Sequence, residues 1–338
     1  MTHSPPQPRS APPTLPALLG DCAPAILDDC ARHAGTLTRI EAAVGGNVSH
    51  VFRVDGGRGS VIVKVRRGHF ARIPALRTDP ALIADERHAL EVYAAAVPDV
   101  FPRVLGFHAE AHAMILTDVF PDRRSYHEHL NRSPATAEEI ARLGSTLRRI
   151  HQATREIRTP IRSQGDVWFR EHTFDFCLRA RGHKALDESC EELATQPGQQ
   201  LILGDLAPKN LSLAAGRVAL CDLDNVHRSW PLYDVAYFLA HLLIHHLAQP
   251  HHLPALVRAL LSGYFGAQPP EGAAGLLMAK VTAGVVLYRL SNDTVPYLLA
   301  QPPALAERYR NRVLGLLDTA VFAVHDLVHA TEPGEAGP

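Results

Sequence analysis

The sequence Gly204-Asp205-Leu206-Ala207-Pro208-Lys209-Asn210 precedes a short apolar run that ends in Cys221-Asp222-Leu223-Asp224. This run has apolar residues on both sides of Gly216, which predicts a strand, a turn and a second strand. A hairpin of this kind brings its two ends back together. We therefore expect Asp222 to lie beside Asn210.

Two carboxylates and one carboxamide in this arrangement suit phosphoryl transfer. The reaction needs a carboxylate that orients the attacking hydroxyl and accepts its proton, together with oxygen ligands that hold magnesium against the phosphates. Asp205 and Asn210 have the spacing of a kinase catalytic loop. We predict Asp205 as the catalytic base, Asn210 and Asp222 as metal ligands, and ATP and Mg²⁺ as cofactors. The alternative is that Asp205 and Asn210 only cap turns through local hydrogen bonds.

This segment resembles the signature of the aminoglycoside phosphotransferase and choline kinase superfamily. In that family the loop usually begins His-Gly-Asp and the metal segment reads Ile-Asp-Phe, whereas here Leu203 replaces the His and Leu223 replaces the Phe. The stretch 230–238 also resembles the family's Asp-Pro-x-Tyr-Asp-Leu-Ala segment, in which Asp234 would cap a helix or brace the catalytic loop. The resemblance spans roughly residues 38 to 325. It implies an α+β, protein-kinase-like fold with two lobes, of which the smaller holds an antiparallel β-sheet and one key helix and the larger is mainly helical.

The resemblance also implies a nucleotide-binding N-lobe, for which the sequence supplies candidates in the right order. A glycine-containing turn before a run of alternating apolar residues predicts a hairpin that covers the phosphates, with Gly45, Gly46 and Asn47 at its tip. The β-branched run at 60–65 predicts a strand covered on both faces, and its one basic residue, Lys64, is the candidate phosphate contact.

A helix is predicted to begin at Pro80, a favoured first helical position, and to run to Tyr93. Glu86 is the candidate partner of Lys64, with Asp85 and Glu91 as competing acids. In the family, the last N-lobe strand ends in a hinge whose main chain binds adenine. The corresponding residues here are Thr117, Asp118 and Val119.

From these assignments we expect four parts of the chain. They are a flexible tail at 1–20, an N-lobe at 21–118, a C-lobe with the catalytic loop and acceptor site at 119–330, and a second flexible tail at 331–338.

The acceptor is a small hydroxylated molecule whose identity the sequence leaves open. Three segments, 46–54, 97–102 and 279–289, resemble methylthioribose kinases, but the histidines that flank the catalytic Asp in those enzymes are absent. The first hypothesis is therefore a methylthioribose-like sugar or related alcohol. The alternatives are an aminoglycoside or other natural product and, from another class, a nucleotide-binding pseudokinase without activity. Candidate acceptor contacts are Asp224, Trp168 and Arg289.

Composition is consistent with a globular enzyme. The 338-residue chain is 46% hydrophobic and 20% charged, and its net charge of −1 gives no reason to expect a nucleic-acid partner. Five cysteines without metal-site spacing suggest reduced thiols and a cytoplasmic protein. The apolar run at 235–247 is shorter than the roughly 20 residues of a bilayer crossing, so we expect a buried helix and no membrane partner. Its histidines suggest zinc, but no Cys or carboxylate nearby completes a site, and we interpret them as incidental.

Overall fold

The computed structural model describes residues 13–43, 46–120, 122–162, 178–179, 182–266, 268–291, 297 and 299–332. Contacts within the chain separate two compact units, which we describe one at a time. Unit 1 consists of Met1–Ala84 and Val104–Asp118, and unit 2 of Asp85–Arg103 and Val119–Pro338. A segment that we assigned to the N-lobe, Asp85–Arg103, thus groups with unit 2.

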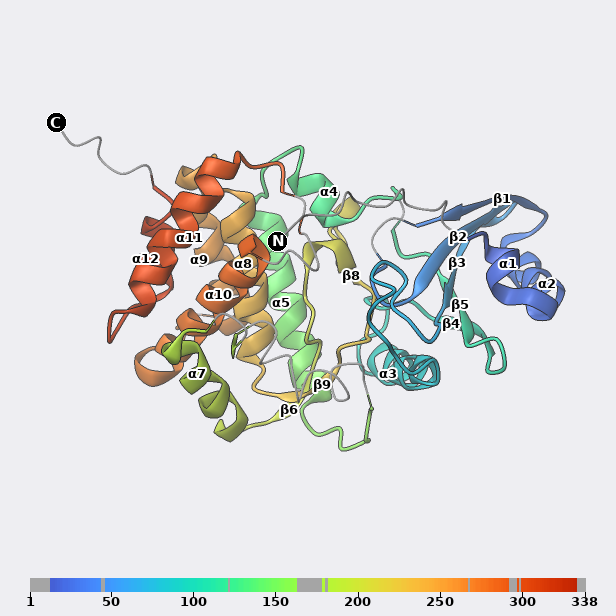
Figure 1. Ribbon diagram of the computed structural model, residues 1–338, viewed down its shortest axis with the longest axis horizontal. Coiled ribbons are helices and arrows are strands. Elements are labelled where there is room, and N and C mark those ends of the chain that lie inside the picture. The colour runs from blue at the N-terminus through green and yellow to red at the C-terminus, as the bar shows by residue number, and fades with distance from the viewer. Residues whose placement is uncertain are drawn as a thin grey trace, which may run out of the picture. The chain divides into compact units, whose positions relative to one another are not determined.

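Unit 1 contains a five-stranded antiparallel sheet (Figure 1). In spatial order its strands are β1 (Leu37–Ala42), β2 (His50–Gly56), β3 (Gly59–Val65), β5 (Ala113–Thr117) and β4 (Val104–His108). The predicted β2–β3 hairpin is present, and Gly59, at φ 133°, closes its turn in a conformation that favours glycine. Alternate apolar residues of β2 and β3, among them Val54 and Val63, are buried in the core of this unit.

Two N-terminal helices complete unit 1. Helix α1 (Leu15–Leu19), a 3₁₀ turn (Gly20–Cys22) and helix α2 (Ala23–Ala34) precede the sheet, and α2 packs against β2 and β3 (Figure 1). The predicted flexible tail at 1–20 is therefore wrong for residues 15–20. Leu15 and Leu19 are one helical turn apart, and both are buried in the same core as Ile26. Burial of these leucines explains why this short, proline-flanked segment is ordered.

Unit 2 is mainly helical (Figure 1). Its helices, with α3 beginning at the end of unit 1, are α3 (Leu82–Ala96), α4 (Tyr126–Leu130), α5 (Ala137–Thr154), α7 (Lys184–Thr195), α8 (Leu232–His245), α9 (Leu253–Phe265), α10 (Gly272–Ser291), α11 (Pro303–Leu317) and α12 (Val324–His329). Short 3₁₀ turns cover Pro208–Asn210, Ala214–Gly216 and Pro250–His252. Two small antiparallel ladders pair β6 (Gln200–Ile202) with β9 (His227–Ser229), and β7 (Leu211–Ser212) with β8 (Ala219–Leu220).

Helices α5 and α9 approach each other closely because glycines face the contact. A Cβ at Gly144 would lie 2.5 Å from the carbonyl oxygen of Leu260, and one at Gly263 would lie 2.4 Å from that of Ala141. Neither distance is possible for a real side chain, so both positions require glycine. The N-terminus of α5 is fixed by a capping box, in which Thr136 and Glu139 satisfy each other's backbone N–H groups.

Helices α8 and α10 pack together and form the centre of unit 2. The apolar run predicted to be a buried helix is α8, and every one of its residues is buried. Helix α10 has the length and apolar composition of a membrane span, although 67% of its most apolar window is buried inside the structure. A core helix has the same composition, and the packing of α10 against α7, α8, α11 and α12 gives it that role here.

Candidate active site

The catalytic loop leaves β6 at a glycine that no other residue could replace. Gly204 has φ 75°, and a Cβ there would lie 2.3 Å from the carbonyl oxygen of Asn225. The chain then turns through the 3₁₀ segment Pro208–Asn210 into β7. The Asn210 amide donates to the backbone oxygen of Asp205 at 3.1 Å and to its carboxylate at 3.2 Å. The loop thus holds the predicted base and the predicted metal ligand against each other.

The predicted hairpin after Asn210 is present but short. Its strands, β7 and β8, have two residues each, and the 3₁₀ turn Ala214–Gly216 replaces most of the expected strand. The backbone N–H of Cys221 donates to the carbonyl oxygen of Asn210 at 2.9 Å. This bond closes the hairpin and brings the backbone of Asp222 next to the catalytic loop, as the sequence predicted.

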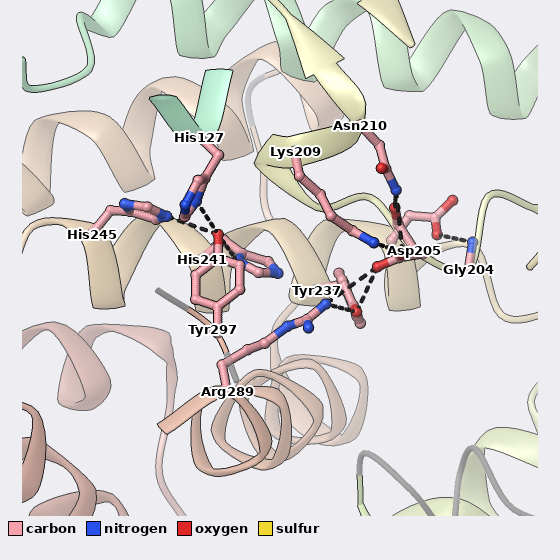
Figure 2. Close-up of polar contacts among 11 residues, drawn as sticks. His127, Gly204, Asp205, Lys209, Asn210, Tyr237, His241, His245, Arg289 and Tyr297 are labelled. Atoms are coloured by element: carbon pink, nitrogen blue, oxygen red, sulfur yellow. Dashed lines mark hydrogen bonds and ion pairs between the residues drawn. The ribbon is translucent and has the colours of Figure 1, made fainter. Parts of the chain in front are cut away.

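Three cationic or phenolic groups surround the Asp205 carboxylate (Figure 2). The Tyr237 hydroxyl donates to it at 2.7 Å, Arg289 Nη2 lies at 3.3 Å and Lys209 Nζ at 3.3 Å. Arg289 Nη2 also donates to the Tyr237 hydroxyl. Burial alone would raise the pKa of Asp205, but the charges of Lys209 and Arg289 and the Tyr237 hydrogen bond hold this pKa below its usual value. Asp205 is therefore ionised at neutral pH, as a hydroxyl-orienting base must be.

A second carboxylate, that of the fully buried Asp234 at the start of α8, holds the backbone of the catalytic loop in place. It accepts hydrogen bonds from the backbone N–H groups of Leu203 and Gly204 at 2.8 and 2.9 Å. It also pairs at 3.0 Å with Nε2 of His151, whose Nδ1 lies 2.7 Å from the Tyr264 hydroxyl. Leu203 stands where the family has its loop histidine, and it is buried. Asp234 holds the loop there instead, through the backbone N–H groups of Leu203 and Gly204.

A candidate cation site lies within unit 2. Glu86 on α3 and the two aspartates after β8, Asp222 and Asp224, offer carboxylate oxygens that all lie within 4.8 Å of one another. The segment after α3 is tied to β8 by a hydrogen bond from Leu220 N to Val100 O at 2.8 Å. Carboxylate oxygens are hard ligands, so this donor set fits Mg²⁺ or Ca²⁺. Like charges so close together repel each other, and a bound cation would offset that repulsion.

Glu86 consequently has a neighbourhood that the sequence did not indicate. We predicted it as the partner of Lys64, and the structure groups it with Asp222 and Asp224. Lys64 is buried on β3 in unit 1, opposite Val51 and Met114 in the ladders. The pairing of Lys64 with Glu86 stays a prediction.

The other predicted nucleotide contacts lie in or beside unit 1. At Gly46 a Cβ would lie 2.5 Å from the carbonyl oxygen of Ser49, so the turn before β2 is tight there. The carbonyl oxygen of Asn47 accepts a hydrogen bond from Arg72 N at 3.2 Å. Thr117 ends β5, and Val119 is the first residue after unit 1.

The Asp118 side chain has a structural role. Its carboxylate pairs with Arg53 at 2.9 Å and accepts from the Ser60 hydroxyl at 2.7 Å. The nucleotide contact predicted for the main chain of Thr117, Asp118 and Val119 remains a prediction. Gly45 and Trp168 lie outside the described residues.

Of the predicted acceptor contacts, Asp224 belongs to the carboxylate group and Arg289 contacts Asp205. Sequence reasoning missed Tyr237 and Lys209. Lys209 lies between Asp205 and Asn210 in the loop, and Tyr237 lies one helical turn after Asp234, so both could have been proposed from spacing alone. His151, which comes from α5, carried no such signal.

A protein-family model matches most of the chain. The model of the phosphotransferase enzyme family, to which aminoglycoside phosphotransferases belong, matches residues 39–274. No curated protein matches the sequence.

Solved structures resemble the fold at low sequence identity. An amicoumacin kinase in complex with AMP-PNP, Ca²⁺ and Ami has a TM-score of 0.57 at 15% identity, covering 92% of this chain and 98% of its own. A microcompartment-associated aminopropanol kinase has a TM-score of 0.55 at 17% identity, with coverages of 86% and 98%. A choline/ethanolamine kinase family protein from Mesorhizobium loti has a TM-score of 0.54 at 17% identity, covering 91% of this chain and 98% of its own.

These matches confirm the predicted two-lobed α+β fold of the protein-kinase type and the resemblance on which it rested. The chain therefore belongs to the phosphotransferase enzyme family.

Proposed function

We propose that this protein transfers a phosphoryl group from ATP, with Mg²⁺, to a hydroxyl of a small sugar or related alcohol, with Asp205 as the base. The observation that carries the proposal is the Asp205 carboxylate, which is hydrogen-bonded to Asn210 in a loop whose hairpin leads directly to the carboxylates of Asp222 and Asp224. A base and a cluster of oxygen ligands are the parts that phosphoryl transfer requires.

In this proposal the Asp205 carboxylate orients the attacking hydroxyl and accepts its proton. Its low pKa limits its strength as a base, which suits a transition state in which the proton moves late and positioning matters most. Lys209 and Arg289, each 3.3 Å from this carboxylate, fix its orientation and supply positive charge near the reacting oxygen.

The proposed metal ligands are Asn210, Asp222 and Asp224. Glu86 is a further candidate ligand, because its carboxylate lies close to those of the two aspartates. Mg²⁺ bound there would neutralise charge that develops on the phosphates. The structure of an amicoumacin kinase with AMP-PNP and Ca²⁺ supports a nucleotide and a divalent cation in this fold. Lys64, the turn at Gly46 and Asn47, and the main chain of 117–119 are the proposed nucleotide contacts.

The proposed acceptor is a methylthioribose-like sugar or related alcohol. An antibiotic or other natural product is the second candidate, because one relative is named as an amicoumacin kinase. The pseudokinase hypothesis is disfavoured, since a protein that only binds nucleotide has no need of an ionised carboxylate held by Tyr237 and two cations.

The test is ADP release with ATP and Mg²⁺ across a panel of methylthioribose, other pentoses, aminoglycosides and hydroxylated amines. We expect turnover that depends on one acceptor class and is lost in Asp205→Asn. Turnover with Asp205→Asn as fast as with the unaltered chain would contradict the proposal.

A further inference from the structure

Beside Asp205, Tyr297 and three histidines of α4 and α8 form a cluster of polar side chains that the proposed mechanism does not use. The hydroxyl of Tyr297 lies within hydrogen-bond distance of three imidazoles, at 3.0 Å from His127 Nδ1, 3.0 Å from His241 Nδ1 and 2.8 Å from His245 Nε2 (Figure 2). We call these four residues the histidine cluster. His241 lies one turn after Tyr237 on α8, so the cluster continues the surface that holds Asp205.

Proton positions in the cluster follow from its hydrogen bonds. The Asn131 side chain accepts from Ala300 N at 3.4 Å through its oxygen, so its NH₂ group donates to His127 Nε2 at 3.1 Å. His127 must then carry its proton on Nδ1 and donate it to the Tyr297 hydroxyl. That hydroxyl has one proton and one remaining lone pair, and it shares them between His241 and His245.

Both of these histidines are neutral. Burial, followed by the neighbouring Arg289, lowers the pKa of His241 well below its usual value. Burial and then His127 do the same to the pKa of His245. Arg289 and Lys209 are the permanent cations whose charges act on His241, and they disfavour a second positive charge there. The cluster therefore carries hydrogen-bonding capacity without charge.

Three nitrogens at this surface still lack a hydrogen-bond partner among the residues that the structure describes. They are Nε2 of His241, which is fully buried, Nδ1 of His245, which is 3% exposed, and Nε of Arg289, which is 7% exposed. In Figure 2 the ring of His241 lies between Tyr297 and the side chains that surround Asp205. Buried polar atoms rarely stay without a partner, so a ligand beside Asp205 is the natural source of one.

The charge of this surface disfavours a cationic ligand. Asp205 is already paired with two cations, Lys209 and Arg289, so these three groups together carry a net positive charge. The guanidinium of Arg289 also lies over the aromatic rings that could otherwise receive an ammonium group. The distances from its Cζ to the ring centroids are 5.5 Å for Tyr237, 4.9 Å for Tyr288 and 5.1 Å for Tyr297.

A carboxylate ligand is disfavoured for a geometric reason. Carboxylates bind arginine best through two parallel donors, and on this side of Arg289 the pair would be Nε and Nη2. Nη2 is already used by Asp205 and Tyr237, which leaves the single donor Nε. One donor and one imidazole nitrogen suit a hydroxyl, which both donates and accepts.

We propose that the acceptor is an uncharged, hydroxyl-rich molecule of the sugar or polyol class, and that its part remote from the reacting hydroxyl binds His241 Nε2 and Arg289 Nε. This inference rests on the proposed function and narrows it to one substrate class, with aminoglycosides and amino alcohols excluded.

The test compares acceptor pairs that differ only in charge, on the full chain with ATP and Mg²⁺. Suitable pairs are glucose with glucosamine and glycerol with 3-amino-1,2-propanediol, and gluconate adds an anion. We expect kcat/KM at least tenfold higher for the uncharged member of a pair. With a non-hydrolysable ATP analogue present, we also expect the uncharged member to raise the melting temperature more.

Variants separate a recognition role from a structural one. Arg289→Gln should lower the preference for the uncharged member at least tenfold, because it removes the charge that repels ammonium groups. Arg289→Lys should keep that preference. His241→Phe should raise KM for uncharged acceptors without changing KM for ATP. Arg258→Gln, at an exposed position on α9, is the matched control and should change nothing.

Preference for the cationic or anionic compounds, or an unchanged preference in Arg289→Gln, would overturn the inference. Slow ATP hydrolysis without acceptor tests the proposed function separately. If hydrolysis is lost in Asp205→Asn while ammonium acceptors are preferred, the inference falls and the proposed function stands.

Discussion

Asp234→Asn tests how the catalytic loop is held in place, because the substitution keeps the size of the side chain and removes one acceptor. The carboxylate accepts three hydrogen bonds, from Leu203 N, Gly204 N and His151 Nε2, and it is fully buried. An amide offers one oxygen, so its NH₂ group must face a backbone or imidazole N–H. A lost hydrogen bond to a charged group costs about 1.5–3 kcal/mol, and an unpaired buried donor adds a penalty of similar size.

We therefore expect Asp234→Asn to lower the free energy of unfolding by about 3–6 kcal/mol. Because Gly204 directly precedes Asp205, the base should also lose its position, and kcat should fall at least tenfold, which corresponds to about 1.4 kcal/mol in the barrier. Urea denaturation followed by circular dichroism measures the first quantity, and ADP release measures the second.

The matched control is Asp318→Asn, at a carboxylate that is 77% exposed and pairs only with His183 among the described residues. It should change stability by less than about 0.5 kcal/mol. A double-mutant cycle with His151→Gln isolates the contribution of the His151–Asp234 pair. If Asp234→Asn were as stable and as active as the unaltered protein, the bracing role would be refuted.

Three further predictions follow from single features. Asp222→Ala should weaken Mg²⁺-dependent nucleotide binding at least tenfold in a titration with fluorescent ATP, with metal-free binding unchanged; equal weakening without metal would argue against a ligand role. Gly144→Ala should lower the free energy of unfolding by at least about 2 kcal/mol in urea denaturation, because its Cβ would meet the carbonyl oxygen of Leu260 in α9. A cost within about 0.5 kcal/mol would mean that α5 and α9 can move apart without loss of stability. Cys30 should resist a thiol reagent at pH 8 in the folded protein, since burial raises the pKa of its thiol to about 12 and leaves little thiolate, and rapid labelling there would show that the site opens.

The sequence predicted the parts of the site that lie close together along the chain. Asp205, Asn210 and Asp222 belong to one loop and one hairpin, so their spacing already determines their proximity. The contacts of Arg289 and Glu86 with this region depend on how helices pack, which no local pattern records. Arg289 was named from a family resemblance, without any indication that it would touch Asp205.

The N-terminal segment shows why composition can mislead. The proline- and serine-rich composition of residues 1–16 suggested a flexible tail, yet Pro16 is at the start of α1, where its missing N–H costs nothing. Leu15 and Leu19 then bury against the core of unit 1. The incidental role that we gave the histidines of α8 was also incomplete, because His241 and His245 share the hydroxyl of Tyr297, a residue remote in sequence.

The most direct test of the account is the rate of ADP release by Asp205→Asn, measured together with its affinity for ATP and Mg²⁺. If Asp205 is the base, the rate should fall at least about a thousandfold while nucleotide affinity stays within about threefold of that of the unaltered protein. A rate within tenfold, equivalent to a change of about 1.4 kcal/mol in the barrier, would show that another group accepts the proton and that the proposed mechanism is wrong.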